Sequence, residues 1–294
     1  MTDLAMGPAL LFCPADRLGR FAKAAARADA VILDLEDAVA PSAKTAARGA
    51  LIESDLDPDR VIVRVNALDG PDIVSDLSSL SQTDYRTIMV AKAESPKRIG
   101  RLDPRLRVIA LCETAKGVAA AERLAALDNV AGLMWGAEDL VASLGGTSSR
   151  RPSGRYRDVA RYARSRVLVA AGAQGKAAVD AVHLDIADLR GLAREAADAA
   201  ASRFHATACI HPGQVPVIRE AYRPDAEDVA WARAVLDAAA GERGVFAFRG
   251  TDGRRARPAA RADGALARVS RLGRQAGMPR LESTRMRSRS TSSV

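Results

Sequence analysis

A barrel of alternating strands and helices is the fold class that the sequence predicts, and three observations support it. The chain has 294 residues, a length that suits one barrel domain. Short apolar runs recur along the chain, and Ala-rich helical segments lie between them. The runs are continuous rather than alternating, which is typical of parallel strands that are covered on both faces. About eight such repeats favour an α/β fold of the (β/α)8 TIM barrel type, with a C-terminal helical extension, over an open doubly wound sheet.

Eight apolar runs are the expected strands of this barrel, in chain order. They are residues 9–13, 30–35, 60–65, 87–92, 107–112, 130–135, 181–185 and 206–210. The helices expected between and after them include residues 17–28, 117–127, 156–173 and 226–241. Polar residues follow nearly every strand. Because the carboxyl ends of barrel strands form the active-site face, these polar residues are the candidates for function.

The positive charge of the chain is concentrated at its C-terminal end. The net charge is +8, but residues 254–294 hold 11 Arg and only two acids, so they carry +9 and the remaining residues −1. We therefore expect a near-neutral barrel domain over residues 1–250 and an Arg-rich tail over residues 251–294, partly disordered at its end. A basic chain of this kind is weak evidence for nucleic-acid binding by the barrel.

Cysteine usage and hydropathy suggest a protein of the cytoplasm. Cys13, Cys112 and Cys209 each lie in an apolar run and form no C-x-x-C pair, which is typical of buried, reduced thiols. No run of 18 apolar residues predicts a membrane span, and the first residues lack the pattern of a signal peptide.

Several motifs of common enzyme classes do not occur in the sequence. It has no G-x-G-x-x-G after a first strand, no P-loop, no G-x-S-x-G and no H-E-x-x-H. Their absence weighs against dinucleotide binding, ATP hydrolysis, serine hydrolase chemistry and zinc protease chemistry.

Carboxylates cluster at three of the expected strand ends. The segment "DLED" places Asp34, Glu36 and Asp37 together, and crowding of this kind raises pKa values unless cations offset it. Glu113 ends the fifth expected strand, and Asp139 follows the sixth. Each acid alone would more often cap a helix. Their repetition at one rim instead favours a shared divalent cation, and oxygen ligands without His or Cys suit Mg²⁺.

Three basic residues also lie in or just after the expected strands. Arg64 lies inside a strand, where an unpaired charge is costly, so it either pairs with Asp34 or Glu36 or clamps a substrate carboxylate or carbonyl. Lys92 is expected to contact an anion or form an ion pair rather than act as a Schiff-base lysine. For His211, capping or a core hydrogen bond is as plausible as catalysis. The Gly-, Ser- and Arg-rich segment after residue 144 suits a loop that closes over an anionic ligand.

Several motifs occur in an order and spacing that resemble a known family. They are "LFCPADRLGRFAKAAARADAVILDLEDAVAPSAKTAAR", "VRVN", "ALCETAKG", "GLMWGAEDL" and "CIHPGQ". Together they resemble the citrate lyase β-subunit-like branch of the HpcH/HpaI aldolase superfamily over residues 8–250. The resemblance implies a Mg²⁺-dependent carbon–carbon lyase in a (β/α)8 barrel, usually a homotrimer. Its substrates would be β-hydroxyacyl thioesters such as citryl-, malyl- or citramalyl-CoA.

The resemblance also implies roles for particular residues. Glu113 and Asp139 match direct Mg²⁺ ligands, and Glu36 and Asp37 match acids that hold the waters of the ion. Arg64 matches the arginine that holds the oxo-acid part of the substrate, and Glu113 also borders that part. The backbone of residues 136–138, which are Gly136, Ala137 and Glu138, would approach the bound acid.

The sequence departs from the family pattern after residue 250. A Met-Val-Asp stretch, whose Asp reaches a neighbouring active site, is replaced by an Arg-rich run, and Ala91 stands where Pro is common. Three alternatives therefore stay open beside a lyase of free CoA thioesters. The chain could use an acyl-carrier-protein thioester inside a citrate lyase assembly, or be a metal aldolase for oxo-acids without a thioester. It could also be a catalytically impaired barrel whose basic tail binds nucleic acid or an acidic partner.

Overall fold

The computed structural model describes residue 4, residues 6–224 and residues 226, 229, 230 and 233. The chain divides into two compact units, Met1–Tyr222 and Arg223–Val294. The first unit holds the predicted barrel. The expected boundary at residue 250 and the Arg-rich tail of residues 251–294 lie outside the described residues.

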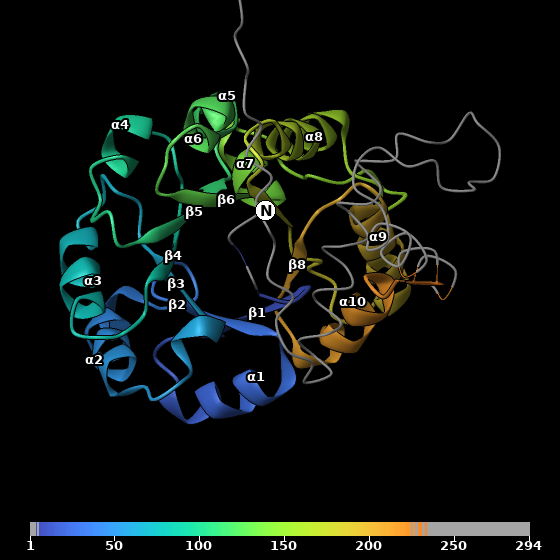
Figure 1. Ribbon diagram of the computed structural model, residues 1–294. Coiled ribbons are helices and arrows are strands. Elements are labelled where there is room, and N and C mark those ends of the chain that lie inside the picture. Colours follow the sequence, from blue (N-terminus) through green and yellow to red (C-terminus); the bar gives the residue numbers. More distant parts are fainter. Residues whose placement is uncertain (1–3, 5, 225, 227–228, 231–232, 234–294) are drawn as a thin grey trace, which may run out of the picture. The chain divides into compact units, whose positions relative to one another are not determined.

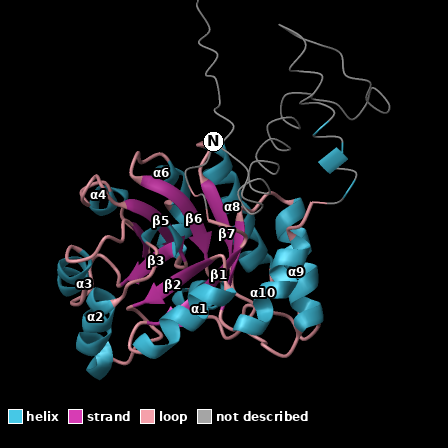
Figure 2. Ribbon diagram, turned by 60° about the horizontal axis from the view of Figure 1, so that its bottom comes forward, coloured by secondary structure: helices cyan, strands magenta, loops and turns pink. Residues whose placement is uncertain are grey.

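Eight parallel strands close into a barrel in the order of the chain, from β1 to β8, and β1 pairs with β8 (Figure 1). The helices surround this barrel (Figures 1 and 2). The predicted (β/α)8 fold is therefore confirmed for the first unit. The strands are β1 Ala9–Pro14, β2 Ala30–Asp34, β3 Val61–Val65, β4 Thr87–Val90, β5 Arg107–Cys112, β6 Val130–Trp135, β7 Ala177–Asp180 and β8 Ala206–Cys209.

The helices between the strands are short, apart from two long ones before and after β7. The α-helices are α1 Phe21–Arg27, α2 Lys44–Glu53, α3 Ile73–Leu80, α4 Pro96–Ile99, α5 Ala115–Ala119, α6 Ala121–Ala125, α7 Ala137–Ser143, α8 Asp158–Ala173, α9 Leu189–Ala201 and α10 Val215–Ala221. In the described part of the chain, four single turns of 3-10 helix accompany them, at η1 Leu18–Arg20, η2 Pro41–Ala43, η3 Pro58–Arg60 and η4 Pro212–Gln214.

The apolar core has two layers, and their alternation places the functional side chains. Ile32, Ile62 and Leu111 belong to the layer that fills the barrel, while their strand neighbours pack under the helices. Side chains two residues apart in a strand point to the same face. Asp34, Arg64 and Glu113, each two residues further on, therefore continue these interior rows at the mouth of the barrel.

The seventh strand was expected at residues 181–185, and that expectation is wrong. The strand is formed by Ala177–Asp180, and its residues Ala177 and Ala178 pair with Gly132 and Leu133 of β6. Small residues give a weak apolar signal, so the sequence pattern favours the more apolar segment that follows. That segment leads into α9, and Asp185 there bonds backbone amides of the loop. The fourth strand is also shorter than expected: it ends at Val90 and not at residue 92.

The expectation for the cysteines is confirmed. Cys13, Cys112 and Cys209 are buried and free. Burial raises the pKa of Cys112 and that of Cys209 to about 12, so both stay thiols at neutral pH. Over the described part of the chain, no helix has the length and apolar character that crossing a membrane requires.

Candidate active site

Arg64 and Asp34 form a buried ion pair at the carboxyl ends of β3 and β2. They are partners in the strand register, and Nε and Nη2 of Arg64 each donate to one oxygen of Asp34 at 2.6 Å. The same carboxylate accepts the backbone amides of Glu36 and Ala38, at 2.9 and 3.1 Å. Asp34 thus fixes both the guanidinium and the start of the loop that carries Glu36. The ring of Phe12 lies 4.9 Å from the guanidinium carbon of Arg64.

Glu36 lies between two cations at the mouth of the barrel. Its Oε2 is 3.1 Å from Nη1 of Arg64, and its Oε1 accepts from Nζ of Lys92. Burial raises the pKa of Glu36, and the two cations only partly offset this effect. Its Oε2 is buried without a well-aligned hydrogen bond. Glu36 therefore has one oxygen whose bonding capacity the protein itself does not fill.

Lys92 joins the acidic loop after β2 to the end of β5. Besides Glu36, its Nζ lies 3.3 Å from Oδ2 of Asp37, whose side chain is mostly exposed. Burial lowers the pKa of Lys92, but the hydrogen bond to Glu36 and the surrounding acids raise it well above its usual range. The expected ion pair is observed, and the lysine stays charged.

Glu113 is a buried carboxyl directly after β5. Its Oε1 accepts the backbone amide of Lys92 at 3.0 Å. Burial raises its pKa to about 8, Arg64 opposes this effect, and the charges of Asp139 and Glu36 add to it. A carboxyl with this pKa is mostly protonated at neutral pH unless a further positive charge lies beside it.

Asp139 approaches Glu113 from the start of α7. Gly136 is the N-cap residue of that helix, and Asp139 lies in its first turn. A Cβ atom on Gly136 would lie 2.8 Å from Cβ of Glu113, so only glycine allows the loop to pass this close. Glu138 lies beside them, but it is exposed and accepts a hydrogen bond from Ser149.

These observations fit a divalent cation with few protein ligands. The charge of Asp139 adds to the cost of ionising Glu113, and a cation beside Glu113 would relieve that cost. Among the described residues, no three His, Cys, Asp or Glu side chains are arranged to hold a metal ion. Mg²⁺ is commonly held by one or two carboxylates and keeps several waters, so a pair of acids is a sufficient donor set. Both residues were predicted as its ligands.

Two residues that sequence reasoning did not assign hold the loop after β2. Nζ of Lys44 donates to the carbonyl oxygens of Leu35 and Glu36 and to Oδ1 of Asn66. The amide of Asn66 in turn donates to the Leu35 carbonyl and to Asp76. The "VRVN" motif contains Asn66, but its partner Lys44 is 22 residues away, and the sequence gives no sign of their contact.

The loop between α7 and α8 is anchored to the barrel by Arg150 and Tyr156. Arg150 donates two hydrogen bonds to Glu195 of α9, and its guanidinium stacks 3.8 Å from the ring centre of Tyr156. Tyr156 packs edge-on against Trp135 at the end of β6. Glu195 also bonds Nδ1 of the buried His183 at 2.9 Å. The charge of Arg150 is therefore satisfied within the protein, so this loop arginine is not a ready contact for a ligand.

His211 has a structural role in the described chain. Its ring accepts the backbone amide of Gly213, and Gln214 bonds back to the backbone of His211, which completes a capping box. The capping alternative is thus the one observed.

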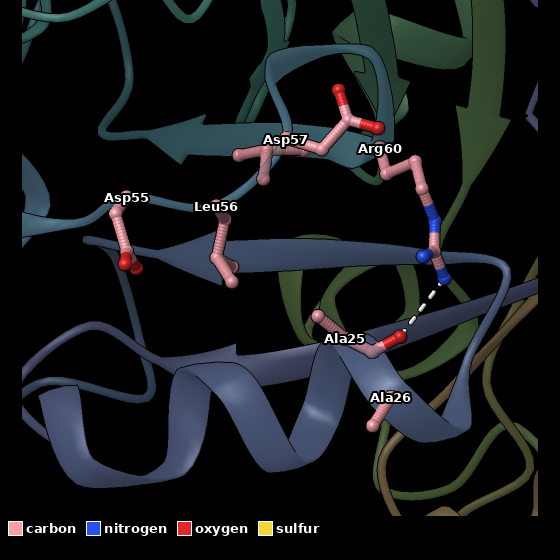
Figure 3. A pocket seen from close by; sticks show the side chains of 7 residues that line it. Ala25, Ala26, Asp55, Leu56, Asp57 and Arg60 are labelled. Carbon is pink, nitrogen blue, oxygen red and sulfur yellow. Dashed lines mark hydrogen bonds between the residues drawn. The ribbon is translucent and has the colours of Figure 1, made fainter.

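A hollow of about 250 Å³ lies at the opposite end of the barrel, by α1 and the start of β3 (Figure 3). Its Arg60 donates to the carbonyl oxygens of Ala25, Ala28 and Asp29, which closes the C-terminal end of α1. In this fold that end serves stability, whereas the carboxyl strand ends carry the chemistry. We therefore place the site at the acid and arginine cluster and not in the hollow.

The fold and this cluster define a class of protein, a (β/α)8 barrel with an acid-rich mouth whose carboxylates suit a divalent cation. The chain belongs to the HpcH/HpaI aldolase/citrate lyase family, whose model matches residues 9–212. A citrate lyase subunit beta-like protein of Mycobacterium tuberculosis is 59% identical over 246 residues, which are 84% of this chain and 90% of that protein.

Two further relatives extend the comparison. The mitochondrial citramalyl-CoA lyase of Homo sapiens is 32% identical over 76% of this chain and 74% of its own length. The crystal structure of the CitE protein from Mycobacterium tuberculosis, in complex with magnesium, acetoacetate and coenzyme A, superposes with a TM-score of 0.79. It is 55% identical and covers 92% of this chain and 99% of that one.

Proposed function

We propose that this chain is a Mg²⁺-dependent carbon–carbon lyase acting on a β-hydroxyacyl-CoA thioester of the citryl-, malyl- or citramalyl-CoA type. The observation that carries the proposal is the cluster of Arg64, Glu36, Glu113 and Asp139 at the barrel mouth. Family membership and the magnesium and coenzyme A bound to the related CitE protein support the same conclusion.

Glu113 and Asp139 are the proposed cation ligands, and Glu36 and Asp37 would hold water molecules around the ion. Bound Mg²⁺ supplies positive charge that polarises the carbonyl group formed on the oxo-acid half of the substrate. The pair fits this task because the charge of Asp139 and the burial of Glu113 already favour a nearby cation.

Arg64 is the proposed clamp for the oxo-acid half of the substrate. Its five N–H groups exceed the three contacts that it makes with Asp34 and Glu36. The remaining donors, on Nη1 and Nη2, can hold the substrate carboxylate or the developing carbonyl oxygen. Because Asp34 fixes the guanidinium on its other side, the clamp is oriented before substrate binds.

The bond between Cα and Cβ breaks when the β-hydroxyl proton leaves and the electrons of that bond pass to the thioester. The thioester half leaves as an enolate, which then gains a proton. The backbone amides of Gly136, Ala137 and Glu138 are proposed to hold the bound oxo-acid half. Glu36 is a candidate to receive the hydroxyl proton, since it is buried, has a raised pKa and keeps Oε2 without a well-aligned partner.

We further propose that the chain works in the cytoplasm as a homotrimer, with residues 1–250 as the catalytic domain and residues 251–294 as a separate tail. A lyase of free CoA thioesters is favoured over a metal aldolase for oxo-acids, because the related CitE protein holds coenzyme A. Sedimentation of the full chain would give the oligomeric state, and a value for a monomer would contradict the trimer.

A substrate panel tests the function directly. Citryl-, malyl-, citramalyl- and hydroxymethylglutaryl-CoA would each be incubated with the full chain in Mg²⁺ and, as the control, in EDTA. We expect cleavage of at least one thioester in Mg²⁺ and none in EDTA. Cleavage only after addition of other citrate lyase subunits would favour the carrier-protein alternative. No cleavage of any thioester would contradict the proposal.

A further inference from the structure

Lys92 has a backbone conformation that its neighbours do not share. Its φ angle is 48°, and among the described residues only Arg203 is another non-glycine residue with a positive φ. Such a conformation costs about 1 kcal/mol or more for a residue with a side chain, so the surrounding structure must enforce it. Strain of this kind often occurs where a protein positions functional groups.

The left-handed turn redirects one backbone amide. In a regular strand, residues two apart bond to the same neighbouring strand. Here the amide of Ala91 donates to Val65 at the end of β3, whereas the amide of Ala93 donates to Leu111 in β5. The reversal takes place at Lys92, and its own N–H is left without a strand acceptor. That N–H donates instead to Oε1 of Glu113.

The side chain of Lys92 contacts two further acids, Glu36 and Asp37. Its Nζ bonds Glu36 and lies 3.3 Å from Asp37. The two acids follow β2, while Glu113 follows β5, and β3 and β4 lie between those strands. One residue therefore contacts the acids of both strand ends, through its backbone on one side and its ammonium group on the other.

We propose that Lys92 is a positioning residue that fixes the carboxyl of Glu113, a proposed ligand of the divalent cation, relative to Glu36 and Asp37, which would hold the waters of that ion. This inference rests on the proposed function, because it concerns the same cation site. Lys92 itself need not touch the substrate or the ion.

The alternative is that Lys92 only neutralises surplus negative charge. The two roles predict opposite effects on cation binding. If Lys92 only neutralised charge, its removal would leave the acids in place with less opposing charge, and a divalent cation would bind more tightly. If Lys92 positions the acids, its removal lets them separate, and the cation binds about 10-fold or more weakly, as for other residues that orient metal ligands.

Mn²⁺ binding to the full chain, measured by titration calorimetry without substrate, separates the two roles. Lys92→Met keeps the backbone amide and the aliphatic stem but removes the ammonium group. We expect at least a 10-fold loss of Mn²⁺ affinity, a lower kcat with a smaller change in KM, and substantial recovery of both in Lys92→Arg. Lys97→Met, at an exposed lysine of α4, is the matched control and should match the wild type.

Two more variants test the backbone half of the proposal. Lys92→Gly relieves the positive φ and keeps the amide, so it should fold more stably than Lys92→Val and still lose affinity with the ammonium group. Lys92→Val lacks the ammonium too, but its branched Cβ resists φ 48°. It should bind Mn²⁺ more weakly than Lys92→Met, because the amide no longer faces Glu113.

Unchanged or tighter Mn²⁺ binding by Lys92→Met overturns the positioning role, and equal binding by the Val and Met variants overturns the role of the amide. If the wild type itself binds Mn²⁺ and cleaves a thioester, either result leaves the proposed function intact. A wild type that binds no divalent cation overturns both proposals. The melting temperature of each variant shows whether a loss of binding is a loss of the fold.

Discussion

Gly136 lies so close to Glu113 that a Cβ atom added to the glycine would come within 2.8 Å of the Cβ of the glutamate and 3.1 Å of its Oε2. The φ angle of Gly136 is −127°, so the backbone itself would accept any residue. What excludes a side chain is the side chain of Glu113, first through its Cβ and then through the carboxyl that we propose as a cation ligand. The glycine in "WGAED" is thus explained by contact with Glu113 and not by the turn.

Gly136→Ala should therefore damage the cation site without unfolding the barrel. The added methyl group must push Glu113 or the start of α7 aside, and we expect Mg²⁺-dependent turnover to fall about 10-fold or more, as for other disturbed ligand shells. Gly49→Ala is the matched control. Gly49 lies inside α2 with no atom within 4 Å of the new Cβ, so its replacement should raise the stability by up to about 1 kcal/mol and leave turnover unchanged. Wild-type turnover in Gly136→Ala would show that Glu113 tolerates displacement.

Asp34→Asn should destabilise the protein strongly. The change removes the charge that two hydrogen bonds from Arg64 satisfy, and it leaves a buried guanidinium without its main partner. Breaking a buried ion pair in this way typically costs about 3–5 kcal/mol, which urea unfolding would measure. Asp84→Asn serves as the control, because the Asp84 side chain is 91% exposed and should change stability by no more than about 0.5 kcal/mol. Equal stabilities of the two variants would mean that the pair contributes nothing.

Replacing a proposed ligand should have a larger effect on Mg²⁺-dependent turnover than replacing an acid beside it. Glu113→Ala and Asp139→Ala are expected to abolish Mg²⁺-dependent turnover with the unfolding transition retained. Asp37→Asn should weaken Mg²⁺ affinity about 10-fold without erasing it, because the Asp37 side chain is mostly exposed and contacts Lys92 at the edge of the cluster. Unchanged activity in either alanine variant would refute the ligand assignment. Complete loss of the ion in Asp37→Asn would make Asp37 a direct ligand.

The anchor of the α7–α8 loop gives a prediction for acid stability. Burial raises the pKa of Glu195, but hydrogen bonds from His183 and Arg150 outweigh it and hold the pKa at about 2. A carboxyl whose folded pKa is depressed stabilises the fold above its unfolded pKa, near 4.5, and loses that contribution as the pH falls toward 2. Glu195→Gln should thus be less stable than the wild type at pH 7, and the difference in unfolding free energy should shrink between pH 5 and pH 3.

Glu122→Gln is the control for that measurement, because Glu122 pairs with Arg166 at the surface and is 56% exposed. Surface pairs contribute little, so this variant should follow the wild type closely at every pH. If the gap between the wild type and Glu195→Gln stayed constant with pH, the ionised form of Glu195 would not stabilise the loop.

The barrel and its acid-rich mouth were predictable because they follow from local patterns. Continuous apolar runs mark the strands, and a polar residue after such a run marks a strand end. The prediction of the seventh strand failed because Ala177 and Ala178 carry little apolar signal. Both residues are buried in the strand that pairs with β6 at Gly132. A Cβ atom on Gly132 would lie only 3.0 Å from a backbone oxygen. This close packing arises from the folded barrel, so the local sequence does not reveal it.

The contacts within the site could be predicted from the sequence only in part. Arg64 left two possibilities open, and only the strand register, which places it beside Asp34, shows the ion pair. Lys92 was expected to pair with acids, but no sequence pattern indicates a left-handed lysine whose amide turns to Glu113. Such a conformation is imposed by the strands on either side, so it appears only once the barrel is closed.

The central claim is that this chain breaks a carbon–carbon bond with the help of Mg²⁺. Mass spectrometry of the products from the best thioester of the panel tests it most directly. We predict an oxo acid and a shortened acyl-CoA in equal amounts, formed in Mg²⁺ and not in EDTA. Release of free coenzyme A with an intact hydroxy acid, or cleavage that is equally fast in EDTA, would contradict the account.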